Sequence, residues 1–125
     1  MILGIGTDIV EISRIKASID RNPHALPRRV LTDRELESFA RAHRPEAFLA
    51  KRFAAKEAAS KAFGTGIGKI AWHDLEVTND DQGAPSLLCF GNAKVMLEHM
   101  AASRIHLSLA DEREAALAFV VISKD

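Results

Sequence analysis

The sequence contains a single cysteine, Cys89, and no apolar run that approaches the roughly 20 residues needed to cross a bilayer. One cysteine excludes an internal disulfide framework and a zinc site built from cysteines alone. The first residues lack the basic start of a signal peptide, and an acidic residue, Asp8, comes too early for one. We therefore expect a cytoplasmic protein with no membrane segment.

Internal repeats, low-complexity tracts and linkers are also absent. A chain of 125 residues is long enough to bury a core in one piece, so we expect a single domain over residues 1–125. The net charge is zero, yet residues 12–69 carry 13 lysines and arginines against 6 acidic residues. Such a segment favours an anionic partner (phosphate, nucleic acid or an acidic protein), although solvated helix faces would give the same composition.

The apolar pattern predicts an α+β domain with an antiparallel sheet packed on helices. We expect helices over residues 13–22, from about residue 26, and over 32–43, 45–63 and 92–102. The third of these begins with a capping box, in which Thr32 is the N-cap and Glu35 is at N3. The expected strands are residues 2–12, 75–78, 86–90, 104–110 and 115–123. The last strand is nearly all apolar, which predicts a central strand that is buried on both faces and forms a hairpin with the strand before it.

The first strand contains a carboxylate, Asp8, among apolar residues. Gly4 and Gly6 on the same strand indicate that another backbone approaches closely. Because burying a lone carboxylate is costly, Asp8 must be paired, hydrogen-bonded or bound to a cation. A cap or a salt bridge, for example to an arginine, would satisfy Asp8 as well as a metal ion would.

Glu57 and Lys61 lie one turn apart on the long alanine-rich helix. The small residues Ala54 and Ala58 beside them would let a ligand approach that face, although a surface ion pair has the same spacing. The glycine-rich segment 64–69 follows this helix and fits neither the dinucleotide fingerprint nor a Walker A loop. It can form a concavity of backbone N–H groups for a phosphate, or it can serve only as the helix C-cap.

Taken in order along the chain, these segments resemble the holo-[acyl-carrier-protein] synthase family, the small bacterial 4′-phosphopantetheinyl transferases. The resemblance is carried by residues 5–12 (IGTDIVEI) and 52–67 (RFAAKEAASKAFGTGI), and the second block is highly specific. Shorter blocks at residues 29–32, 72–77, 83–85 and 106–111 extend it over essentially the whole chain.

The resemblance implies transfer of the 4′-phosphopantetheine group from coenzyme A to a serine of apo acyl carrier protein, with release of adenosine 3′,5′-bisphosphate. It implies a magnesium-dependent transferase of fatty acid biosynthesis, with the 4′-phosphopantetheinyl transferase fold. It also implies a homotrimer with active sites between subunits, and neither a nucleic acid nor a membrane as partner.

Asp8 and Glu57 match the family's metal ligands, which suits the preference of Mg²⁺ for hard oxygen donors. Lys61 matches a lysine that contacts phosphate. With Asp8 and Glu57, it completes the catalytic set that the resemblance implies. The positions that match coenzyme A contacts are Arg52, Lys61, Gly64, Thr65, Gly66, Pro85 and His106. The nucleophile belongs to the carrier protein, so this chain must supply the base that removes its proton. We favour Glu57, acting directly or through a metal-bound water. Asp8 is the alternative.

Acyl carrier proteins are acidic, and Arg14 and Arg21 on the first helix match family positions that dock them. Lys16, Arg28 and Arg29 are added to this docking surface on charge alone. Many relatives have Ser/Thr-His at the end of the penultimate strand, where this chain has Ala110-Asp111, so no role of that histidine is carried over.

Three alternative functions are disfavoured. A non-catalytic module that binds nucleotides or carrier protein predicts loss of Asp8, Glu57 or Lys61, and all three are present. A DNA-binding protein is suggested by residues 31–36, which resemble the start of a helix-turn-helix, but the overall neutrality and the missing recognition helix argue against it. A transferase acting on large synthases is usually two fused copies of this unit, which the chain length disfavours.

Overall fold

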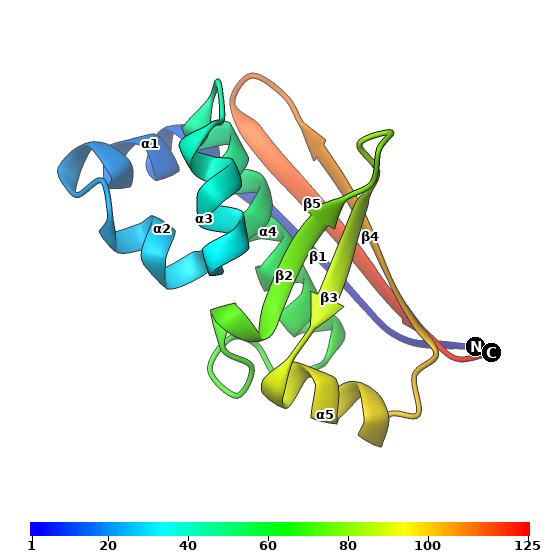
Figure 1. Ribbon diagram of the computed structural model, residues 1–125. Helices are drawn as coiled ribbons and strands as arrows, with labels where there is room; N and C mark the ends of the chain where they lie inside the picture. The colour runs from blue at the N-terminus through cyan, green and yellow to red at the C-terminus, as the bar shows by residue number, and fades with distance from the viewer.

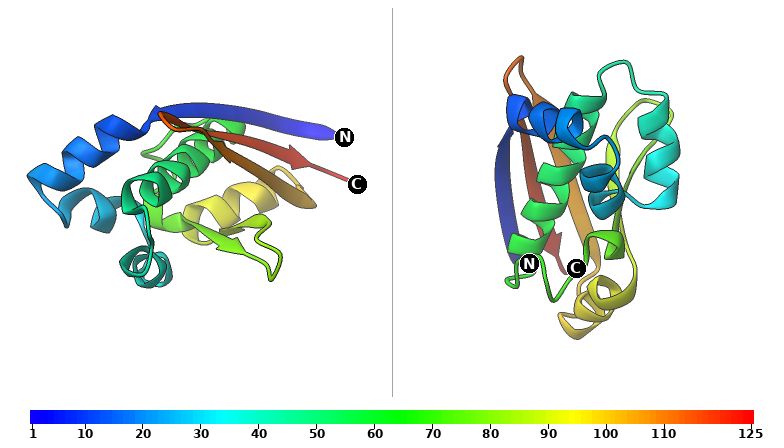
Figure 2. Two further views of the ribbon diagram at one scale, coloured as in Figure 1. Left: turned by 90° about the horizontal axis from the view of Figure 1, so that it is seen from above. Right: turned by 90° about the vertical axis from the view of Figure 1, so that its left-hand side faces the viewer.

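Helix α4 (Pro45–Ala62) runs through the middle of the molecule, and the other elements pack around it. In the computed structural model, which describes all 125 residues, an antiparallel sheet with the strand order β1–β5–β4 covers one side of α4 (Figure 1). A two-stranded hairpin and helix α3 lie on the other side (Figure 2). The predicted α+β arrangement, an antiparallel sheet packed on helices, is confirmed.

The strands of the larger sheet are β1 (Ile2–Glu11), β5 (Ala115–Ser123) and β4 (Arg104–Asp111), and those of the hairpin are β2 (Leu75–Asn79) and β3 (Pro85–Cys89). The remaining helices are α1 (Ile12–Arg21), α2 (Ala25–Val30), α3 (Asp33–Ala40), α5 (Gly91–His99) and the short 3₁₀ helix η1 (Trp72–Asp74). Every predicted element is present, although α3 and α5 end three residues earlier than expected. No helix is long and apolar enough to span a bilayer.

Strand β1 lies against α4 with almost no space between the two backbones. A Cβ atom at Gly4 would collide with the carbonyl oxygen of Ala62, and one at Gly6 with that of Ala58. The predicted close approach is therefore confirmed. Because alternate residues of a strand point to the same side, the side chain of Asp8 also faces α4.

The core is built mainly from alanines of α4 and from the inner face of the sheet. Ala54, Ala58 and Ala59 are fully buried, as are Val120 and Ile122 on β5. Small side chains on α4 let the sheet and the hairpin approach it from opposite sides. The helix is therefore buried around most of its circumference, and any polar residue that it carries inward needs a partner.

The prediction that β5 is buried on both faces is wrong for the single chain. Strand β5 is central, pairing with β1 and β4, but its residues Leu117 and Phe119 are 41% and 43% exposed. Ile5 and Ile9 of β1 are exposed beside them, at 61% and 67%. No element of this chain covers these four side chains, which we call the open sheet face.

Candidate active site

A cleft of about 480 Å³ lies between β1, α1 and α4. Four residues singled out in the sequence line it, namely Asp8, Glu57, Arg14 and Arg21. Apolar side chains, including Phe53, form the rest of its wall. The structure therefore brings together the two carboxylates and the two arginines, although they come from three different elements.

Local structure explains why these side chains meet. Asp8 points inward from β1, two residues beyond the glycine that lies against Ala58. Glu57 is next to Ala58 on α4. Helix α1 buries Ile12 and Ile15, so Arg14 and Arg21, which are seven residues or about two turns apart, point together along the cleft.

The two carboxylates are in different electrostatic situations. Asp8 Oδ1 accepts a hydrogen bond from Lys61 Nζ at 3.2 Å, and the same ammonium donates to the carbonyl oxygen of Thr7 at 3.0 Å. The carboxylate of Glu57 accepts no hydrogen bond, and its pKa is raised by partial burial and by the neighbouring Asp8 charge, with Lys61 opposing. Lys61 therefore pairs with Asp8 across 53 residues, and the surface pair Glu57–Lys61 is not formed. The salt-bridge alternative for Asp8 is observed, with a lysine.

This donor set fits a magnesium ion. Magnesium is usually held by one or two protein carboxylates, with phosphate oxygens and water completing its six ligands. Asp8 and Glu57 provide two such carboxylates, and one neighbouring ammonium leaves the trio with excess negative charge. No group of three or more histidine, cysteine, aspartate or glutamate side chains is arranged to hold a metal, so a site made by protein ligands alone is not present.

The glycine loop after α4 caps the helix. Gly64 and Gly66 have φ values of 80° and 71°, which only glycine adopts at low cost. The backbone N–H groups of Thr65 and Gly66 both donate to the carbonyl oxygen of Ser60, at 3.2 Å. A Cβ atom at either glycine would meet nothing within 4 Å, so within one chain the glycines are required by backbone conformation and not by close approach.

None of the seven predicted coenzyme A contacts lines the cleft. Lys61 reaches its edge through Asp8, and the glycine loop follows Lys61, but the other three lie farther away. Arg52 points about 140° away from Glu57 around α4, and it donates a hydrogen bond to Asn79. Pro85 is the residue opposite Asn79 in the hairpin. His106 is exposed on β4, with Nε2 3.1 Å from Ser123 Oγ. In one chain these residues therefore do not share a cavity with Asp8 and Glu57.

Asp111, which stands where many relatives have a histidine, lies at the end of β4. Its Oδ1 atom is 3.6 Å from the ammonium of Lys51 on α4. Both side chains are about one-third exposed, so the pair resembles a surface ion pair.

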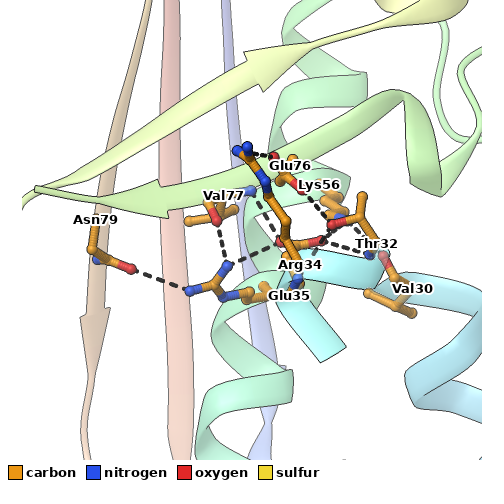
Figure 3. A network of polar contacts seen from close by, with 9 residues as sticks. Val30, Thr32, Arg34, Glu35, Lys56, Glu76, Val77 and Asn79 are labelled. Atoms are coloured by element: carbon orange, nitrogen blue, oxygen red, sulfur yellow. Dashed lines mark hydrogen bonds and ion pairs between the residues drawn. The ribbon is translucent and has the colours of Figure 1, made fainter. Parts of the chain in front are cut away.

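Sequence reasoning missed a buried cluster of charges on the hairpin side of α4. Lys56 is fully buried, and its Nζ donates to Val30 O and to Glu35 Oε1, both at 2.6 Å (Figure 3). Burial lowers the pKa of Lys56, although the negative charge and hydrogen bond of Glu35 act to raise it. Burial also opposes ionisation of Glu35, but the Lys56 charge and several hydrogen bonds outweigh it and lower the pKa of Glu35.

The signal that could have found this cluster was a lysine at the centre of an otherwise alanine-rich buried stripe. Lys56 follows Ala54 and Ala55 and precedes Ala58 and Ala59, all of which are buried. Glu35 was recognised only as part of a capping box with Thr32, which the structure confirms.

Comparisons with known proteins identify the family and the fold of the chain. Residues 4–120 match the 4′-phosphopantetheinyl transferase superfamily. The chain is 52% identical over 122 residues to the holo-[acyl-carrier-protein] synthase of Escherichia coli O9:H4 (strain HS), and the match covers 97% of both proteins. The crystal structure of the holo-[acyl-carrier-protein] synthase from Neisseria meningitidis is similar with a TM-score of 0.93 at 43% identity, covering 99% of this chain and 100% of that one. The synthase from Bacillus anthracis, in complex with CoA (3′,5′-ADP), has a TM-score of 0.84 at 40% identity and covers 100% and 99%.

Proposed function

The chain belongs to the holo-[acyl-carrier-protein] synthases of the 4′-phosphopantetheinyl transferase superfamily, and we propose that it catalyses the Mg²⁺-dependent transfer of 4′-phosphopantetheine from coenzyme A to a serine of apo acyl carrier protein. The transfer would yield holo carrier protein and adenosine 3′,5′-bisphosphate. We place this reaction in fatty acid biosynthesis, in the cytoplasm, and assign it to one domain spanning residues 1–125.

The observation that carries this proposal is that one cleft contains both a pair of carboxylates suited to a cation and a pair of arginines suited to an acidic protein. Asp8 and Glu57 form a site with excess negative charge that fits a divalent cation. Arg14 and Arg21 line the same cleft and suit an acidic protein. A transfer from a magnesium-bound pyrophosphate to a carrier protein requires both at the same place.

In this mechanism Asp8 and Glu57 hold Mg²⁺, which when bound neutralises charge on the pyrophosphate of coenzyme A. Lys61 would place its ammonium on a phosphate oxygen, since half of its side chain is exposed beside Asp8. The carrier serine oxygen forms a bond to the phosphorus that bears pantetheine. The bond from that phosphorus to the bridging oxygen breaks, and adenosine 3′,5′-bisphosphate leaves.

We assign the proton of the carrier serine to Glu57. Its carboxylate accepts no hydrogen bond within the chain, and partial burial with the neighbouring Asp8 charge raises its pKa, which makes it a stronger base. A base needs a free acceptor atom that faces the nucleophile, and Glu57 lies in the wall of the cleft.

The remaining assignments require more than one copy of the chain. Gly64, Thr65 and Gly66 follow Lys61 directly and are proposed to border the cofactor. Arg52, Pro85 and His106 are proposed to contact coenzyme A from a neighbouring subunit, since none of them lines the cleft of its own chain. A homotrimer with active sites between subunits would supply these contacts and would bury the open sheet face, which carries four exposed apolar side chains.

The decisive assay incubates the protein with coenzyme A, an apo acyl carrier protein and Mg²⁺, and records the mass of the carrier. A mass increase equal to phosphopantetheine is expected, and a chelator should suppress it. If several bacterial carriers remain unmodified, the proposed activity is wrong. Light scattering after size exclusion should give three times the mass of the chain, and a monomer would overturn the subunit arrangement.

A further inference from the structure

The guanidinium of Arg52 is held on several sides by groups that reasoning from the sequence did not connect with it. Its Nη1 atom donates to Glu35 Oε2 at 3.1 Å and to the carbonyl oxygen of Val77, and its Nη2 atom donates to Asn79 Oδ1 at 3.1 Å. The ring of Phe48 lies 4.3 Å from the guanidinium carbon. The side chain is only 9% exposed, so this orientation is fixed by the interior of the protein.

Glu35 is the centre of this arrangement (Figure 3). Its Oε2 atom accepts from Arg52 and from the backbone N–H of Val77, and its Oε1 atom accepts from Lys56 and from the backbone N–H of Thr32. All four neighbours are donors. A glutamine at this position would turn an N–H₂ group toward two of them, so only an ionised carboxylate satisfies the site.

These contacts leave part of Arg52 available. A guanidinium has five N–H donors, and the three hydrogen bonds leave the Nε–H and one Nη2–H unused. The Nε atom has no partner and is not buried, so its donor reaches accessible space. Arg52 lines a small pocket of about 100 Å³ together with Lys51. The pocket therefore contains a held guanidinium with a free donor, beside an ammonium that is paired only loosely with Asp111, at 3.6 Å.

We propose that Glu35 and Asn79 are positioning residues that orient Arg52 to bind a phosphate group of coenzyme A. This inference rests on the proposed function, and it concerns the side of α4 opposite to the cleft of Asp8 and Glu57. Holding the guanidinium in advance removes the entropy that a free arginine side chain loses on binding an anion. Glu35 is buried and acts through Arg52, whereas Asn79 lines the pocket itself and holds Arg52 by its Oδ1 atom.

The test is a double-mutant cycle on coenzyme A binding, measured by isothermal titration calorimetry with Mg²⁺ present and without carrier protein. Glu35→Gln should weaken binding by about tenfold or more, the effect of one misplaced charge-assisted hydrogen bond. Arg52→Met should weaken it by at least as much. The double variant should bind no more weakly than Arg52→Met alone, because Glu35 acts only through Arg52.

Glu76→Gln is the matched control. Glu76 is equally buried in the same network and accepts a hydrogen bond from Thr32 Oγ1 at 2.6 Å, but it does not contact Arg52. Its substitution should leave coenzyme A affinity within about twofold. Equal losses for Glu35→Gln and Glu76→Gln, or additive losses in the cycle, would overturn the proposal in favour of a purely structural role.

Turnover provides a second readout, since Glu35→Gln should raise KM for coenzyme A and leave KM for the carrier unchanged. If Glu35→Gln does not fold, the same double-mutant cycle is measured with Asn79→Ala. The expected loss of coenzyme A affinity is smaller, because Asn79 is exposed and its substitution leaves no buried charge without a partner. Wild-type affinity in Asn79→Ala would then refute the inference. If the wild-type protein binds coenzyme A and modifies a carrier while these variants bind normally, only this inference fails. If the wild type does neither, the proposed function fails and the inference with it.

Discussion

Two neighbouring residues of α4, Lys56 and Glu57, belong to two charge clusters on different sides of the helix. Around Lys56 the charges are buried, and both oxygens of its partner Glu35 accept two hydrogen bonds each. Around Glu57 the charges are partly exposed, and its carboxylate accepts none. The contrast separates two kinds of charge: Lys56 and Glu35 use their hydrogen-bonding capacity within the protein, whereas the carboxylate of Glu57 keeps its capacity for a ligand.

The buried cluster should dominate stability. Lys56→Met leaves Glu35 ionised without its closest cation, so we expect the free energy of unfolding to fall by about 3–5 kcal/mol. Lys61→Met is the counterpart in the open cluster, and because Lys61 is half exposed it should cost at most about 1 kcal/mol. Urea denaturation of both variants measures the difference. Similar losses for the two lysines would remove the distinction between the clusters.

The open cluster should dominate catalysis. Residues that merely orient metal ligands contribute about 10–100-fold, so replacing a ligand, as in Asp8→Asn or Glu57→Gln, should reduce transfer by more than about 100-fold. Circular dichroism should show unchanged folding, and Mn²⁺ titration should show weakened metal binding. Glu46→Gln, which changes an acid in the first turn of α4, serves as the control and should keep the wild-type rate. A near-normal rate in either cleft variant would exclude that residue as a ligand.

A third prediction concerns the arginines that line the same cleft as Asp8 and Glu57. Arg14→Glu reverses a charge in the cleft wall, and we expect KM for the carrier protein to rise on the order of tenfold while KM for coenzyme A stays constant. The effect should shrink at high salt, because the attraction is screened. Lys94→Glu on the exposed side of α5 makes the same charge change away from the cleft and should have little effect. Equal changes in both KM values would argue against docking at Arg14.

The sequence allowed prediction of the parts of these clusters that depend on local pattern. Gly4 and Gly6 indicated the contact between β1 and α4, and Thr32 with Glu35 indicated the helix start. The partners of Lys56 were not predictable, because Glu35 lies 21 residues away on another helix and the two meet only after α3 packs on α4.

The same limit applies to the open sheet face. The nearly continuous apolar sequence of β5 predicted a central strand, and the structure confirms this position. A run of apolar residues indicates that both faces of the strand need to be buried. It does not indicate that residues of the same chain bury them. Phe119, exposed in one chain, shows the difference.

The smallest expected effect is a difference in how the two clusters respond to pH, measured as thermal unfolding midpoints without metal. The pKa of Glu35 is lowered in the folded protein, so its ionisation stabilises the fold above its ordinary value of 4.5, and this contribution disappears as the pH falls through the lowered pKa. The pKa of Glu57 is raised, so the fold favours its protonated form, and the stability gained below pH 4.5 is lost as the pH rises through the raised pKa. Glu57→Gln should therefore raise the midpoint at pH 7 but not below pH 4.5, whereas Glu35→Gln should lower it at pH 7 and lose that effect in acid. A midpoint at pH 7 that falls in both variants would mean that Glu57 also stabilises the fold, and the two clusters would then not differ in kind.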